Sequence, residues 1–441
     1  MGNRAFLPAI LTLAVGCPFP WSSEDKSCEP LARDLSVSRD ADVPTFATMS
    51  FTMAEPGDVT IHATASDSPE VAGPSGEGLE GEVTLPLRGM RPDSEYTVHV
   101  TDAAGCEATA EVTTGALEGE PVALDSGDEA GTHVGFLVLG WLATGTGAGG
   151  VTVLDREGGA VWHHGLEGGV SFAEPTPEED GLLVLHEEGI ETVDWTGAIG
   201  VEVAIEGAHG TATQDVSGVL AAALVQVTEE VPGTGAACGE ETDEVVGETI
   251  VAVGTDGTVT EVWSSFDHWG VECGVFGPVS GGAALASVDY DPGRDQWLVA
   301  SYDEGDLVWI DRGTGEEVFR VGASAKADCA VPLEGPAAAE WTDRGVALLD
   351  TGGGRAIELE VDVDAGTCAI VEEYAVGVST TWGDVDVVDG RWYTAWGDQG
   401  TVRVFEDGAA IWEGDVDSAA SDELGGVIAM SIAWLPDLYG G

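Results

Sequence analysis

Short runs of alternating apolar and polar residues dominate the chain, and turn-forming residues separate them. From about 36 to 117 this alternation is typical of a β-sandwich, and residues 59–63 (VTIHA) are one such strand. Patterns with the helical period are absent over any long stretch. The sequence therefore predicts an all-β protein that begins with a sandwich.

A repeat occupies the remainder, 133–441, after an acidic, Gly-rich linker at 118–132. Each unit has a strand that ends near an Asp, a Gly-containing turn and a second strand that often carries an aromatic residue. The marker residues are Asp155, Asp194, Asp256, Asp311, Asp364 and Asp407. A mean spacing of about 50 residues leaves room for four short strands, which predicts a six-bladed β-propeller. A stacked β-helix is the alternative, but its repeats are shorter and more regular.

Charge narrows the choice of partners. The 441 residues include 80 acidic and 15 Lys or Arg residues, for a net charge of −65. A disordered acidic chain would not have 43% hydrophobic residues and 14 Trp. Nucleic-acid phosphates would repel this protein, so no nucleic-acid partner is predicted. Such acidity fits a salty habitat or an exposed position on the cell envelope.

The first 16 residues have a short charged start and an apolar run that is too short to span a bilayer. With Cys17 they resemble a bacterial lipoprotein signal, although Ala14 stands where Leu is commoner and Leu13 lies one position further out. The resemblance implies cleavage before Cys17 and a lipid anchor there, as the sole membrane contact. Pro18, the residue after this cysteine, is not an acidic signal for retention at the inner membrane. We therefore expect the protein at the outer membrane, on its periplasmic or surface side. An ordinary secretory signal is the alternative.

Six cysteines remain after Cys17, an even number that suits an oxidising compartment. Proximity along the chain predicts the disulfides Cys28–Cys106, Cys238–Cys273 and Cys329–Cys368; the alternative leaves one or more pairs reduced. The sequence predicts no metal site and no cofactor, because CxxC spacing is absent and Asp362 and Asp364 lack further calcium ligands. We expect His163 and His164 in an exposed loop, and His186 in a solvated hairpin.

Residues 87–100 resemble the tyrosine-corner strand of fibronectin type III domains, where a Pro-containing turn leads into a Tyr that packs back. This resemblance indicates a fibronectin type III-like domain at 36–117, with 17–35 as a linker. In the repeat region, residues 287–301, 308–316, 348–355 and 382–386 resemble segments of the bacterial arylsulfate sulfotransferase family, in the family's order. That family combines a small β-sandwich with a six-bladed propeller. Its members move a sulfuryl group from a phenolic sulfate to a phenol through a sulfated histidine.

Carried over residue by residue, the resemblance preserves little of this chemistry. His209 matches a channel histidine and Arg355 matches a family arginine. The family's His-x-Asn pair falls on Ala284 and Ala286, one of its arginines falls near Tyr302, and its nucleophile falls around residues 336–337, Pro-Ala. No histidine follows His268. The predicted ligand-binding residues are therefore His209, Arg355, Tyr302 and Trp382, and no catalytic residue is assigned.

Three functions remain open. The favoured hypothesis is a non-catalytic, lipid-anchored binding protein that takes a small molecule, a glycan or a protein at the propeller channel. The second is an active arylsulfate sulfotransferase with a rearranged site, for which His209 and Arg355 are the candidates. The third is a structural envelope protein whose sandwich makes the contacts.

Overall fold

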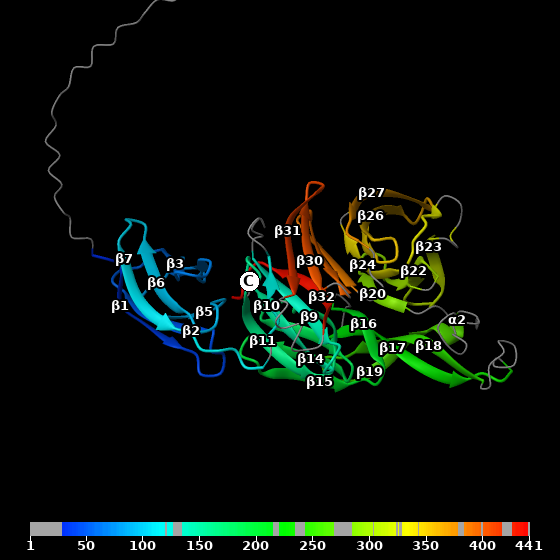
Figure 1. The fold of residues 1–441 in the computed structure, drawn as a ribbon, viewed down its shortest axis with the longest axis horizontal. Helices are drawn as coiled ribbons and strands as arrows, with labels where there is room; N and C mark the ends of the chain where they lie inside the picture. The colour runs from blue at the N-terminus through cyan, green and yellow to red at the C-terminus, as the bar shows by residue number, and fades with distance from the viewer. Residues whose placement is uncertain are drawn as a thin grey trace, which may run out of the picture.

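The computed structural model describes residues 29–119, 121–126, 135–214, 220–233, 243–268, 285–302, 304–322, 325, 329–342, 344–377, 383–397, 400–416 and 426–439. Nearly all of its regular structure is β-strand, in two regions that lie side by side (Figure 1). The first seven strands form a sandwich, and the later strands form a six-bladed propeller. The predicted fold class is therefore confirmed.

The sandwich pairs a three-stranded sheet with a four-stranded one. The first sheet contains β1 (Ala32–Arg39), β2 (Ala47–Met53) and β5 (Glu82–Leu87); the second contains β4 (Val71–Ala72), β3 (Val59–Thr64), β6 (Glu95–Asp102) and β7 (Glu107–Thr113). Tyr96 is buried at the start of β6, and its hydroxyl accepts a hydrogen bond from the Arg91 N–H at 2.9 Å. This contact has the geometry of a tyrosine corner. Strand β1 begins within the stretch predicted as a linker, because Ala32 is buried in the sandwich core.

The propeller contains six blades of four strands each, counted from the central channel outward. Their bounds are: β32 (Val427–Leu435), β9 (Phe136–Ala143), β10 (Ala148–Leu154), β11 (Ala160–Glu167); β12 (Val170–Pro175), β13 (Gly181–His186), β14 (Gly189–Asp194), β15 (Ile199–Ala204); β16 (Ala208–Thr213), β17 (Ala221–Glu230), β18 (Glu244–Val253), β19 (Val259–Ser264); β20 (Leu285–Asp291), β21 (Gln296–Ser301), β22 (Asp306–Asp311), β23 (Glu317–Gly322); β24 (Pro336–Thr342), β25 (Gly345–Asp350), β26 (Arg355–Asp362), β27 (Thr367–Ala375); β28 (Gly383–Val388), β29 (Arg391–Trp396), β30 (Thr401–Glu406), β31 (Ala409–Val416).

The ring closes through its first blade, because the C-terminal strand β32 pairs with β9 from the start of the propeller. A short strand, β8 (Leu124–Asp125), extends the last blade by pairing with β31. Part of the predicted linker is thus a strand of the propeller, since Leu124 is buried in its core. A short helix, α2 (Ser265–His268), follows β19.

The aspartates that marked the repeat lie in one structural position. All six lie where the third strand of a blade turns into the fourth, and Asp194 and Asp311 are the last residues of their third strands. At Asp155, Asp194 and Asp311 the carboxylate accepts backbone N–H groups from the residues two to four positions later, which caps the turn. The repeated Trp162, Trp263 and Trp412 are buried in the blades. The repeat in the sequence therefore corresponds to one turn of the blade.

Specific contacts join the sandwich to the propeller. The Arg91 guanidinium binds both carboxylate oxygens of Asp155, at 2.6 and 3.0 Å. The Tyr439 hydroxyl accepts from the Arg88 N–H at 3.1 Å and donates to the Ala72 carbonyl at 3.0 Å. Phe46 of the sandwich joins the core of the first blades. The end of the chain therefore lies at the junction, as Figure 1 also shows.

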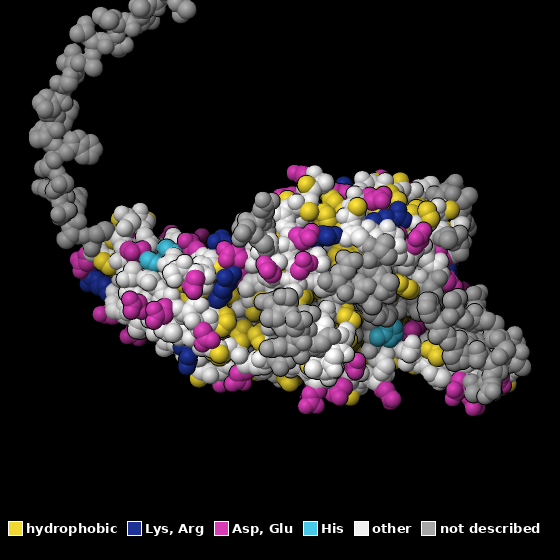
Figure 2. Space-filling view, in the orientation of Figure 1, with side chains coloured by type: hydrophobic (Ala, Val, Ile, Leu, Met, Phe, Trp, Pro, Cys, Tyr) yellow, Lys and Arg dark blue, Asp and Glu magenta, His cyan; other side chains and the backbone are white. Residues whose placement is uncertain are grey.

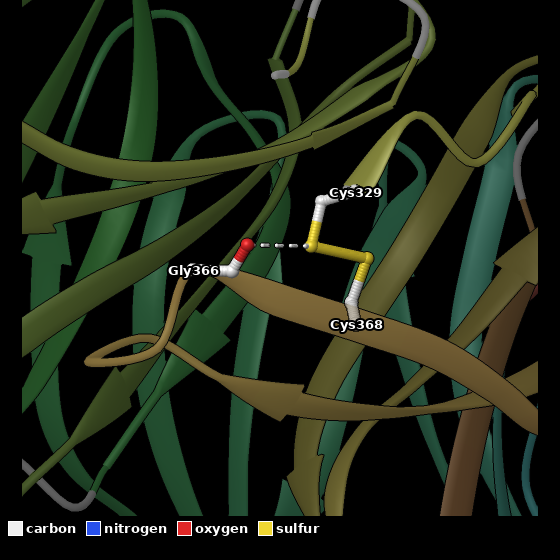
Figure 3. Close-up of a disulfide and its surroundings, with 3 residues drawn as sticks. All are labelled: Cys329, Gly366 and Cys368. Carbon is white, nitrogen blue, oxygen red and sulfur yellow. Dashed lines mark hydrogen bonds between the residues drawn. A yellow bond between two sulfur atoms is a disulfide. The ribbon is translucent and has the colours of Figure 1, made fainter. Parts of the chain in front are cut away.

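One predicted disulfide is confirmed. Cys329 and Cys368 are bonded, with their Cα atoms 5.2 Å apart, and the Cys329 sulfur also contacts the Gly366 carbonyl (Figure 3). Cys106 is disulfide-bonded, but Cys28, its predicted partner, lies outside the described residues. The predicted Cys238–Cys273 pair and the predicted anchor at Cys17 also lie outside them.

Candidate functional site

The six inner strands run in the same direction along the channel, and each end of the channel holds a cavity. The amino-end cavity lies where these strands begin and has a volume of about 330 Å³. The carboxyl-end cavity lies where they end and has a volume of about 410 Å³. Both are lined by residues from the inner strands of several blades. The two cavities differ in charge and in aromatic content.

Carboxylates and aromatic rings dominate the carboxyl-end cavity. All six inner strands contribute to its wall. The acidic lining residues are Glu174, Asp289, Glu340, Asp384 and Asp386, and the aromatic ones are Phe172, Tyr290, Trp341 and Trp434. Lys and Arg are absent from the described lining. The cavity therefore presents negative charge beside apolar ring surface.

A ring of side-chain hydrogen bonds crosses all six junctions between inner strands. Neighbouring inner strands belong to different sheets, so some of their N–H groups need side-chain acceptors. At the first three junctions, the Ala173 N–H donates to Ser431 at 3.0 Å, the Gln214 amide donates to Glu174 at 2.8 Å, and the Val288 N–H donates to Thr211 at 3.0 Å. At the next two, the Trp341 backbone N–H donates to Asp289 at 2.9 Å and the Val387 N–H donates to Glu340 at 2.7 Å. At the last, the Ile432 and Trp434 N–H groups donate to Asp384 and Asp386 at 3.1 and 2.6 Å. Each acid thus has a structural role as well as a place on the cavity wall.

Three of these acids resist ionisation. Burial raises the pKa of Asp384 to about 7, with a smaller contribution from Asp386. Burial likewise raises the pKa of Asp386 to about 6. The pKa of Glu340 lies well above its usual value, because of burial first and then repulsion from Asp386, Asp289 and Asp384. Near neutral pH these three carboxyl groups are therefore harder to ionise than exposed acids.

The aromatic residues add two features. The Arg294 guanidinium lies over the Trp341 ring, 5.8 Å from its centroid, so this ring already contacts a cation. The Trp341 indole N–H is buried and has no hydrogen-bond partner among the described residues. A smaller cavity of about 260 Å³ adjoins this wall and shares Val388 and Trp434 with it. Arg391 lines that outer cavity and pairs with Glu406 at 2.9 Å.

The amino-end cavity is largely apolar, with Leu142, Val170, Ala208, Ile428 and Met430 among its lining residues. His209 reaches it from β16, and its Nε2 lies 2.7 Å from the carboxylate of buried Glu248 on β18. Ala286 and Ala337 line the same cavity. These are positions on or beside which the family resemblance places catalytic groups, and here they carry only methyl groups.

The described members of the predicted ligand-binding set, His209, Arg355 and Tyr302, do not share a cavity. Of the four, His209 alone lines one of the two channel cavities among the described residues. Arg355 lies on β26, the third strand of its blade, and its guanidinium binds Asp350 at 2.9 Å. Tyr302 follows β21 and packs against Gly335. Trp382 and Ala284 lie outside the described residues.

Sequence reasoning missed the acids of the carboxyl-end cavity. Asp384 and Asp386 were noted only as part of a fold segment, although their alternation on an inner strand is a signal that both face the same side. The expected positions of three histidines were wrong. His163 and His164 lie on β11, where His164 pairs with buried Glu191 at 2.7 Å, and His186 is buried at the end of β13. His163 and His164 are half-buried, and the contact of His164 with Glu191 crosses from one blade to the next, which local pattern does not encode.

Within the described ranges, no group of three or more His, Cys, Asp or Glu side chains is arranged to hold a metal ion. The same ranges contain no helix with the length and apolar character needed to cross a membrane. Acidic side chains are spread over the visible face of both regions, and Lys and Arg are few there (Figure 2).

No family model and no curated protein matches the chain. Solved structures do resemble it. A protein of unknown function from Desulfotomaculum acetoxidans is 11% identical, with 76% of this chain and 96% of that one covered and a TM-score of 0.39. Hydrazine synthase from Kuenenia stuttgartiensis is 14% identical, with coverages of 70% and 89% and a TM-score of 0.40. A β-propeller domain from Myceliophteria thermophila is 12% identical, with coverages of 66% and 88% and a TM-score of 0.40. The function of this chain is therefore inferred from its own residues.

Proposed function

We propose that this protein is a non-catalytic, lipid-anchored envelope protein that binds a small molecule in the carboxyl-end cavity of its propeller. The observation that carries the proposal is a cavity of about 410 Å³ built by all six inner strands, with acids and aromatic rings on its wall. A pocket of this size with convergent polar groups is a typical ligand site.

A substitution that narrows the carboxyl-end cavity tests this function. Val388 is half-buried at the end of β28, on the wall shared by the carboxyl-end and outer cavities, so Val388→Trp narrows the site without entering the core. The control is Val259→Trp, on the exposed face of β19. A chemically mixed library should yield compounds that raise the melting temperature of the wild type and the control by more than about 2 °C, but not that of Val388→Trp. Hits that stabilise all three proteins equally would overturn the proposal.

Arylsulfate sulfotransfer is the second candidate. It is favoured by His209, whose imidazole is oriented by Glu248 at 2.7 Å, as a nucleophile or base requires. Against it, Ala286 and Ala337 supply neither a nucleophile nor a donor for sulfonyl oxygens to the same cavity. We expect no transfer from 4-nitrophenyl sulfate to phenol by the purified protein. Robust transfer that His209→Ala abolishes would assign His209 as the nucleophile and refute the non-catalytic reading.

The envelope location rests on the resemblance of residues 1–17 to a lipoprotein signal. Cys17→Ser is expected to move the protein from the membrane fraction to the soluble fraction, because acylation needs the thiol. Unchanged partitioning would refute the anchor. The proposal that the sandwich is fibronectin type III-like is supported by the contact between Tyr96 and the Arg91 N–H.

A further inference from the structure

The inner strands of the propeller share an irregularity near their amino ends. Five of the six, β12, β16, β20, β24 and β32, contain one or two extra residues relative to the second strand of their blade. The extra residues are Ser171, Gly210, Thr211, Ala286, Ala337 and Met430. Such a β-bulge interrupts the ladder of hydrogen bonds and re-aims side chains, and bulges are over-represented at barrel rims and beside active sites.

All six extra residues line the amino-end cavity of about 330 Å³. The remaining inner strand, β28, pairs without a shift and begins at Gly383, which lines the same cavity. Gly210 has a φ of +70°, and a Cβ there would stand 2.5 Å from the Ala286 carbonyl oxygen, so this wall position requires glycine. Among the extra residues Met430 alone has a long side chain, and methionine adapts its shape to its neighbours. The repeated bulge therefore leaves an open cavity at this end of the channel.

The wall of this cavity suits an uncharged molecule. Leu142, Val170 and Ile428 supply apolar surface, and the described part of the wall contains no Lys or Arg to pair with an anion. Glu187 lies on the wall and Glu248 lies behind His209, so an anion would also meet repulsion. Transfer of any ion from water to an apolar surface costs more free energy than transfer of a neutral group.

We infer that the amino-end cavity is a second ligand site, for an uncharged and largely apolar small molecule such as an aliphatic alcohol. The apolar part of the ligand contacts Leu142, Val170 and Ile428, and burial of its surface provides most of the affinity. The inference goes beyond the proposed function, because it concerns the other end of the channel and does not depend on what the carboxyl-end cavity binds.

Met430 is a natural reporter of occupancy. The chain has five methionines, of which Met49, Met53 and Met90 are buried in the sandwich core and Met1 lies in the predicted signal peptide. An NMR spectrum of the mature chain with isotope-labelled methionine methyl groups therefore contains one propeller methyl and three internal controls. The chain is used with Cys17→Ser, because this form carries no acyl group and needs no detergent that would compete for an apolar cavity.

Titration with butanol, pentanol and hexanol is expected to shift the Met430 methyl resonance and to leave the three sandwich resonances in place. Affinity should rise by about fourfold for each added CH₂ group. Hexanoate and hexylammonium add a charge to the same chain. At about 1 M salt, where the Debye length is about 3 Å, each should bind at least about tenfold more weakly than hexanol.

Two variants narrow the cavity from neighbouring blades. Ser171→Leu enlarges the side chain at one bulge, and Ile428→Trp acts from β32; both positions are half-buried. Each should weaken hexanol binding by about tenfold, because the larger side chain occupies the apolar volume. The matched control, Ser38→Leu on the exposed face of β1, should bind hexanol as the wild type does. Unfolding midpoints establish that each variant is folded.

Several outcomes would overturn the inference. A Met430 resonance that no alcohol shifts, or that hexanol shifts equally in the wild type and both narrowed variants, would show that there is no site. Hexanoate binding as tight as hexanol binding would refute the uncharged ligand class. A tighter response to 4-nitrophenyl sulfate than to hexanol would assign the cavity to an anionic ester and favour sulfotransfer. None of these results concerns compounds that Val388→Trp blocks, so the proposed function is tested separately.

Discussion

The two ends of the propeller channel are built from the same six inner strands, yet they offer different chemistry. At the amino end the wall is mostly apolar, with Ser171, Glu187, His209 and Thr211 as its polar side chains, and His209 pairs with Glu248 at 2.7 Å. At the carboxyl end, five acids and four aromatic rings face the channel. The repeated blade therefore sets the geometry of the channel, while the residues at the two ends of the inner strands determine what each end can bind.

The largest expected effect concerns the acids with raised pKa. The double variant Glu340→Gln/Asp386→Asn should gain about 3 kcal/mol of unfolding free energy over the wild type at pH 8. The stability that these acids contribute is fully present below their unfolded-state pKa, near 4, and is lost as pH rises through about 6 and above. The gain should therefore vanish near pH 4. Denaturant unfolding between pH 4 and pH 8 measures it.

Glu202→Gln serves as the control, because this residue is exposed on β15, and we expect it to change stability little at either pH. A double variant that is less stable than the wild type at pH 8 would show that the acids are ionised and compensated in the fold. The electrostatic contrast between the two channel ends would then be wrong.

A smaller effect is expected where the ring of hydrogen bonds uses a neutral group. Ser431 is buried, and its hydroxyl accepts the Ala173 N–H at 3.0 Å. Ser431→Ala should cost about 1–2 kcal/mol at every pH, since it leaves that buried N–H unpaired. Ser38→Ala, on the exposed face of β1, should cost almost nothing. Equal unfolding midpoints for the two variants would argue that the ring contributes little.

The smallest expected effect is at the amino end. His209→Ala removes the partner of buried Glu248 and should cost about 1 kcal/mol, and His209→Gln should recover part of it by donating an amide N–H. Neither variant should alter stabilisation by compounds that Val388→Trp blocks, because His209 lines the other cavity. Weaker stabilisation by those compounds in His209→Ala would mean that the two ends act as one site.

Much of the fold was predictable because local pattern encodes it. Alternation predicted strands, and Asp155, Asp194 and the other marker aspartates predicted six repeats, since all six lie at the same turn of a blade. The Cys329–Cys368 pairing followed from proximity along the chain and is confirmed. The extension of the last blade by β8 was missed, because two residues carry too little pattern to predict a strand.

The candidate site was less predictable. Resemblance directed attention to His209, Arg355, Tyr302 and Trp382, of which His209 is the one the structure places on a channel cavity within its described ranges. The acids of the carboxyl-end cavity were hidden among the 80 acidic residues of the chain. Their burial depends on strands that are separated by about fifty residues along the sequence.

By itself, the sequence determined the strand content, the number of blades and the strongly acidic character of this protein, because each is a local or a summed property. The tertiary structure alone decided which acids become buried neighbours. Asp289, Glu340 and Asp386 belong to three blades, and closure of the ring through β32 and β9 brings their strands around one channel. Burial and mutual repulsion then raise the pKa of Glu340, a property that no single blade has.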